Sequence, residues 1–178
     1  MRVVQALMCA VCSVAVAANA HAQSTADLRT IVRFVECKLD ARAIDRFVGR
    51  VDSGTVRGFT SQPPQEKAVD LAWETEKPIQ AWGTLSNLVS MPSPRQMLLA
   101  VPVPVGDEVN VAKQWAARIG GMSEGAGTVS LRENANWRGV DYRKAVGKKE
   151  IRLLVDQHES PGWILLGCGY DKLFTRSN

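Results

Sequence analysis

Apolar residues near the N-terminus recur at intervals of three and four positions, which is the period of a helix. The residues that share this face are Leu28, Ile31, Val32, Val35 and Leu39. Ser24 is a residue type that caps helices, and it marks the start of this helix. A second short helix is predicted from Asp40, which can cap it, to Gly49, which can end it.

Beyond residue 54 the period of the apolar positions changes to two, as in half-buried strands. Val69 to Glu74 predicts one strand, and Glu76-Lys77-Pro78 predicts the turn after it. Ile79 to Val89 predicts a second strand with a bulge at Gly83. Met97 to Val103 predicts a third strand that is apolar on both faces.

The sequence then repeats this succession of elements. Asp107 begins a predicted helix that Gly120-Gly121 ends, and three strands follow around Val140–Val146, Ile151–Val155 and Ile164–Cys168. Short connections between successive strands favour antiparallel pairing. We therefore predict an α+β fold of helix-plus-antiparallel-β-meander units in the order α(α)-β-β-β-α-β-β-β. The helices are expected to pack on one face of the sheet.

The first 22 residues have the three parts of a secretory signal peptide. Arg2 is followed by a stretch from Val3 to Ala18 that is almost entirely apolar, and Ala20-His21-Ala22 offers small residues to a signal peptidase. No second apolar run follows that is long enough to span a bilayer. We predict a signal peptide over residues 1–22 and a single α+β domain over residues 23–178. The predicted location is the periplasm or the extracellular medium, with no transmembrane segment in the mature chain.

Cysteine usage agrees with this location. Of the four cysteines, Cys9 and Cys12 fall in the predicted signal peptide, which leaves Cys37 and Cys168. Two cysteines in an oxidising compartment predict one disulfide, here between the first helix and the last strand. The alternative is a pair of inert buried thiols.

The net charge of the whole chain is +4, which is mildly basic and does not predict a nucleic-acid partner. Five cations surround one predicted hairpin: Arg143, Lys144, Lys148, Lys149 and Arg152. Such a cluster is typical of a solvated sheet edge. A site for an acidic partner is the alternative.

Catalytic motifs are weak in this chain. Residues Gly121 to Gly125 match the G-x-S-x-G pattern with Ser123 as nucleophile, and His158 lies downstream. That motif needs a strand before the serine and a helix after it, whereas here a helix precedes and a strand follows. Five carboxylates could serve a glycosidase, but nothing marks two as a pair: Glu74, Glu76, Asp107, Glu108 and Glu124.

Metal ligands are sparse as well, because His158 is the one histidine outside the predicted signal peptide. We therefore predict no metal site and no cofactor.

Tryptophan is the more suggestive residue type, and five are present. Trp82 lies between Gln80 and Thr84, on the face opposite Ile79. Trp137 is followed by Arg138. Exposed Trp and Arg side chains are common anchors of protein interfaces. We predict Trp82, Trp137 and Arg138 as binding residues.

Together these features favour a small periplasmic or secreted non-enzymatic binding protein. Its predicted partner is another protein, and the most concrete version is an inhibitor or immunity protein against a secreted enzyme. One alternative is an envelope hydrolase that uses scattered carboxylates or Ser123. Another is an accessory protein of envelope assembly.

Overall fold

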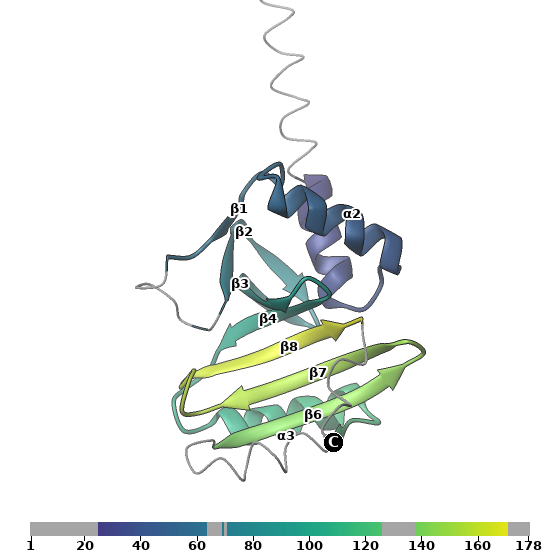
Figure 1. Ribbon diagram of the computed structural model, residues 1–178. Coiled ribbons are helices and arrows are strands. Elements are labelled where there is room, and N and C mark those ends of the chain that lie inside the picture. Colours follow the sequence, from purple (N-terminus) through teal and green to yellow (C-terminus); the bar gives the residue numbers. More distant parts are fainter. Residues whose placement is uncertain (1–24, 64–68, 70, 126–137, 171–178) are drawn as a thin grey trace, which may run out of the picture.

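The predicted α+β class is confirmed (Figure 1). The computed structural model describes residues 25–63, 69, 71–125 and 138–170, so the predicted signal peptide and Trp137 lie outside the described residues. Its elements, after an N-terminal helix over residues 25–35, are α2 (Ala41–Asp52), β1 (Phe59–Ser61), β2 (Ala72–Ala81), β3 (Thr84–Ser93), β4 (Gln96–Pro102), α3 (Glu108–Ile119), β5 (Ser123–Glu124), β6 (Gly139–Val146), β7 (Lys149–Asp156) and β8 (Trp163–Gly169).

All strand pairs are antiparallel, and the order across the sheet is β1-β2-β3-β4-β8-β7-β6-β5. Two meanders, β1 to β4 and β5 to β8, therefore meet where β4 pairs with β8. The short strands β1 and β5 lie at the two ends of this order and were not predicted from the sequence. Within the described part of the chain, no helix is long and apolar enough to cross a membrane.

The helices cover one face of the sheet, as predicted. The N-terminal helix and α2 lie over the half that contains β1 to β4, and α3 lies along β6 to β8 (Figure 1). A single apolar core joins Phe34 and Phe47 of the first two helices to Leu99 of β4, Leu153 of β7 and Leu166 of β8. Burial of these side chains is the main stabilising contribution to the helix-covered face.

The predicted strand boundaries between residues 69 and 89 are wrong. Strand β2 continues through the predicted turn at Glu76 to Pro78, with a register shift between Glu74 and Ile79. The predicted strand from Ile79 to Val89 is instead a hairpin that turns at Trp82 and Gly83. Both turn residues have positive φ, 56° and 76°, as a type I′ hairpin turn requires. The turn was not predicted from the sequence, because a bulky residue such as tryptophan rarely adopts positive φ.

The predicted ends of α2 and α3 are confirmed only in part. Asp40 caps α2 as predicted, since its carboxylate accepts from the backbone N–H of Ala43 at 2.8 Å. The helix continues past Gly49 to Asp52. The side chain of Asp107 makes no capping hydrogen bond to α3.

Candidate functional site: a basic pocket beside the disulfide

The predicted disulfide between Cys37 and Cys168 is present, with 5.2 Å between the two Cα atoms. Cys37 follows the N-terminal helix rather than lying inside it, and its φ of 59° turns the chain toward α2. Cys168 belongs to β8 and is fully buried. The disulfide thus fixes the connection between the two N-terminal helices to the centre of the sheet.

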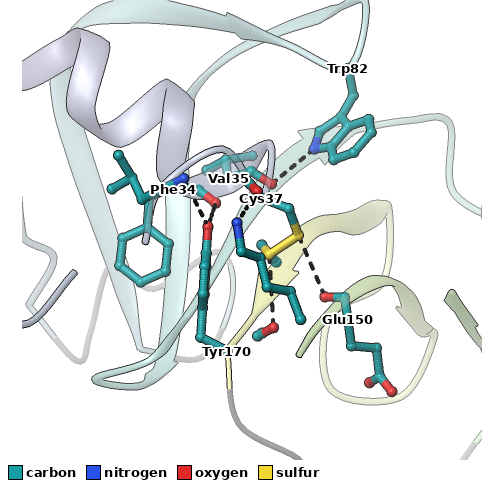
Figure 2. Close-up of a disulfide and its surroundings, with 10 residues drawn as sticks. Phe34, Val35, Cys37, Trp82, Glu150 and Tyr170 are labelled. Atoms are coloured by element: carbon teal, nitrogen blue, oxygen red, sulfur yellow. Dashed lines mark hydrogen bonds between the residues drawn. A yellow bond between two sulfur atoms is a disulfide. The ribbon is translucent and has the colours of Figure 1, made fainter. Parts of the chain in front are cut away.

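Tyr170 holds the same connection through hydrogen bonds of its hydroxyl group (Figure 2). Its hydroxyl accepts from the Leu39 N–H at 3.3 Å and donates to the Phe34 carbonyl at 3.4 Å. Burial raises the pKa of Tyr170 to about 12, so the hydroxyl remains protonated at neutral pH. The end of β8 and the end of the N-terminal helix are therefore joined by a covalent bond and by a buried tyrosine.

A pocket of about 550 Å³ opens at this junction. Its walls come from the connection before α2, the β3–β4 turn, the β6–β7 turn and the residue after β8. We call it the basic pocket, and the residues that line it are Lys38, Leu39, Asp40, Ala41, Arg95, Lys148, Lys149 and Tyr170. Four of these side chains are cationic and one is a carboxylate, which is engaged in capping α2.

The cations of the basic pocket are held to different degrees. The Lys149 ammonium donates to the Cys37 carbonyl at 2.8 Å and lies 5.3 Å from the centroid of the Tyr170 ring. Lys38 pairs with Glu36 at 2.6 Å, and Arg95 pairs with Asp45 at 3.2 Å. Lys149 is thus the cation that the fold positions most firmly.

Trp82, a predicted binding residue, lies next to this junction at the tip of the β2–β3 hairpin (Figure 2). Its indole N–H donates to the Val35 carbonyl at 3.1 Å, and its backbone N–H donates to Glu36 at 3.4 Å. Glu36 is also the ion-pair partner of Lys38. The ring is half-buried, so Trp82 is both a support for the helix end and part of the surface beside the basic pocket.

Arg138, another predicted binding residue, is exposed and directly precedes β6. The basic pocket lies at the opposite end of that strand, where β6 turns into β7. Eight residues of β6 separate the two ends, which is about 26 Å at ~3.3 Å per residue. The structure therefore brings Trp82, but not Arg138, close to the basic pocket.

Of the five cations in the basic cluster of the β6–β7 hairpin, Lys144 donates to the Ile119 carbonyl at 3.4 Å, and the other four divide into two pairs. Arg152 contacts Asp141 through two hydrogen bonds of 2.9 and 3.0 Å, and Arg143 contacts the same carboxylate at 2.7 Å. Asp141 is fully buried and Arg152 is buried. These two arginines are therefore part of an ion-pair network within the fold. Lys148 and Lys149 of the same hairpin instead line the basic pocket.

The hydrolase motif does not form a nucleophile elbow. Ser123 lies in the two-residue strand β5 opposite Arg143, and it is exposed. His158 is in an exposed turn, two residues after Asp156, which pairs with Gly139. Positions 139 and 143 are four residues apart on β6, which is about 13 Å. Ser123 and His158 are thus not brought together.

Glu108, one of the five candidate carboxylates, stabilises the fold through buried hydrogen bonds. It is fully buried and accepts hydrogen bonds from the backbone N–H groups of Gly106 and Gly162 and from the side chain of Gln157, at 2.7 to 2.8 Å. Burial raises its pKa, but the hydrogen bonds that the carboxylate accepts outweigh this effect and hold the pKa below the ordinary value. Glu108 thereby fastens the β7–β8 turn to the start of α3.

Among the described residues, no group of three or more His, Cys, Asp or Glu side chains could hold a metal ion. Comparison of the chain with protein-family models, with curated proteins and with solved structures finds no match in any of the three. The function therefore has to be inferred from the site itself.

Proposed function

We propose that this protein is a small periplasmic or secreted binding protein without catalytic activity. In this proposal it acts as an inhibitor or immunity protein that engages an acidic surface of a secreted enzyme. The observation that carries the proposal is the basic pocket, where Lys38, Arg95, Lys148 and Lys149 converge. The half-buried Trp82 is linked to this pocket through Glu36, which accepts from its backbone N–H and pairs with Lys38.

The chemistry of this surface supports recognition of a protein. Interfaces commonly combine an aromatic anchor with charged groups around it, and complementary charge accelerates encounter with the partner. Trp82 has few rotatable bonds, and its indole is already oriented by the hydrogen bond to Val35. A partner that packs on this ring therefore gains contact area at a small cost in side-chain entropy.

The proposal is tested by capturing the partner from the native periplasmic or secreted fraction with immobilised residues 23–178. The captured protein is identified, purified and titrated, and its enzymatic activity is measured with and without this protein. The expected result is a saturable complex and a fall in that activity. A captured protein whose activity does not change would contradict the inhibitor proposal.

Variants locate the interface. Trp82→Asn keeps a residue that tolerates positive φ and removes the indole, and it is expected to weaken binding by about 2 kcal/mol. The double variant Lys148→Gln/Lys149→Gln is expected to weaken it as well. Lys113→Gln, which removes an exposed lysine of α3, is the matched control and should bind like wild type. Equal binding by all variants would overturn the proposed site.

The remaining predicted residues are tested in the same assay. Arg138→Ala reports on a second contact region beyond the basic pocket, and Trp137→Ala tests the remaining predicted binding residue. Ser123→Ala tests the hydrolase alternative, because a hydrolytic activity lost in this variant would replace binding with catalysis as the function.

A further inference from the structure

We propose that the basic pocket is a preformed receptor for one compact anionic group, a carboxylate or a phosphate. The inference rests on the proposed function only for the source of that group, which would be an acidic side chain of the partner. A volume of about 550 Å³ lies within the range of pockets that enclose small ligands. The pocket is therefore large enough to take in such a group instead of only facing it across a flat surface.

The first argument is the position of Lys149. Its ammonium is fixed by the Cys37 carbonyl on one side and by the face of the Tyr170 ring on the other. Cys37 is itself held by the disulfide, and the Tyr170 hydroxyl is held by Leu39 and Phe34. A charge that is held in place before binding loses little conformational freedom when an anion arrives.

The second argument is the exposure of two further lysines. The side chain of Lys38 is 63% exposed, and its ion-pair partner, Glu36, is not part of the pocket lining. Exposed ion pairs of this kind contribute little, so an anion in the pocket can compete for Lys38. Lys148 is exposed and makes no ion pair with any described residue.

The third argument is the excess of positive charge around the pocket. Asp40 is the one carboxylate against four cations in the pocket lining, and one of its oxygens accepts from the Ala43 N–H. Ala41 is the first residue of α2 and also lines the pocket. The first amides of a helix have no partner within it, so the positive end of α2 adds to the field of the lysines.

Oxyanions are the ligands that fit this set of donors, because ammonium and guanidinium groups make charge-assisted hydrogen bonds to carboxylates and phosphates. Three probes distinguish carboxylate from phosphate as the bound group: inorganic phosphate, citrate and a peptide rich in Asp and Glu. Each is titrated into ¹⁵N-labelled protein at constant ionic strength, with sodium chloride as the control. The amide signals of Lys38, Leu39, Ala41 and Lys149 are followed.

The expected result is a saturable shift of these signals with at least one probe and no saturable shift with chloride. Tighter binding of the peptide or of citrate identifies carboxylate as the preferred group, and tighter binding of phosphate identifies phosphate. Lys149→Gln is expected to weaken binding about tenfold or more, whereas Lys113→Gln should leave it unchanged. The inference is overturned if none of the three probes gives saturable shifts, or if both variants weaken binding equally.

The disulfide-bonded fold of each variant is checked by its unfolding midpoint, so that loss of binding is not confused with loss of structure. This experiment uses the isolated protein and is separate from the capture of a partner. Anion binding without a captured enzyme would refute the proposed function and support the pocket as an anion receptor. A captured enzyme that binds through Trp82, with no anion binding by the isolated protein, would refute the anion receptor and support the proposed function.

Discussion

The β6–β7 hairpin carries two pairs of cations that are close in sequence and have opposite environments. Arg143 and Arg152 share the buried carboxylate of Asp141. Lys148 and Lys149 sit at the turn and line the basic pocket. The arginines match the two oxygens of a carboxylate with planar forks of donors, whereas lysine carries a compact and strongly hydrated charge. The comparison shows that cations close together on one hairpin can have different roles, because some are buried in ion pairs while others line a pocket at the surface.

The largest effect is expected on the pocket side of this comparison, from removal of the disulfide. Cys37 and Cys168 are 131 positions apart, so the loop-entropy relation gives a loss of about 4–5 kcal/mol of unfolding free energy for Cys37→Ala/Cys168→Ala. Urea unfolding of the variant, and of reduced wild type, measures this loss. A change below about 1 kcal/mol would mean that the junction is held mainly by Tyr170 and the surrounding apolar contacts.

The second expected effect is on the buried side. Asp141→Asn removes the buried charge that Arg143 and Arg152 share, and breaking a buried ion pair costs about 3–5 kcal/mol. The matched control is Asp45→Asn, which breaks the exposed pair with Arg95 and should cost at most about 1 kcal/mol. Both are measured by urea unfolding. Equal losses in the two variants would contradict the distinction between the two groups of cations.

A third experiment compares Asp141 with Glu108, a fully buried carboxylate whose partners are neutral. Because the folded pKa of Glu108 lies below its ordinary value, its contribution to stability is present above the unfolded pKa. That contribution is lost as the pH falls through the folded pKa. Glu108→Gln should therefore be less stable than wild type at neutral pH, and the difference should shrink in acid. Unfolding midpoints measured between neutral and acidic pH test this, and a pH-independent difference would contradict it.

The smallest effect is expected from Lys148→Gln. Its side chain is exposed and makes no ion pair with the described residues, so the unfolding free energy should change by less than about 0.5 kcal/mol. Thermal unfolding of this variant beside Asp141→Asn gives the two extremes of the comparison. A large loss in Lys148→Gln would mean that the turn lysine, too, belongs to the folded core.

These particular residues show what the sequence could and could not predict. The fold class, the Asp40 cap and the disulfide follow from local patterns and from the count of cysteines. The hairpin at Trp82 was missed because its positive φ is maintained by contacts to Val35 and Glu36, which lie about 46 positions away in sequence. Tertiary contacts of this kind override the preference of a bulky residue.

The basic pocket was outside the reach of sequence reasoning for a related reason. Lys38, Arg95 and Lys148 come from three separate connections, and only the pairing of β8 with both β4 and β7 brings them together. The charge of the β6–β7 hairpin was visible, but its division was not. The sequence pattern does not reveal that both arginines, and none of the lysines, contact the buried carboxylate of Asp141.

The order of strands in the sheet has a consequence for how the chain is made. Strand β8 is the last described strand in sequence, yet it lies between β4 and β7 and joins the two meanders. Until residues 163–169 have been synthesised, β4 is paired on one side only, by β3, and Cys37 has no Cys168 to bond with. The sheet and its disulfide can therefore be completed only after residues 163–169 are available. Contacts of such long range are typical of slow folding, which leaves time for a newly made chain to meet other cellular components before it closes.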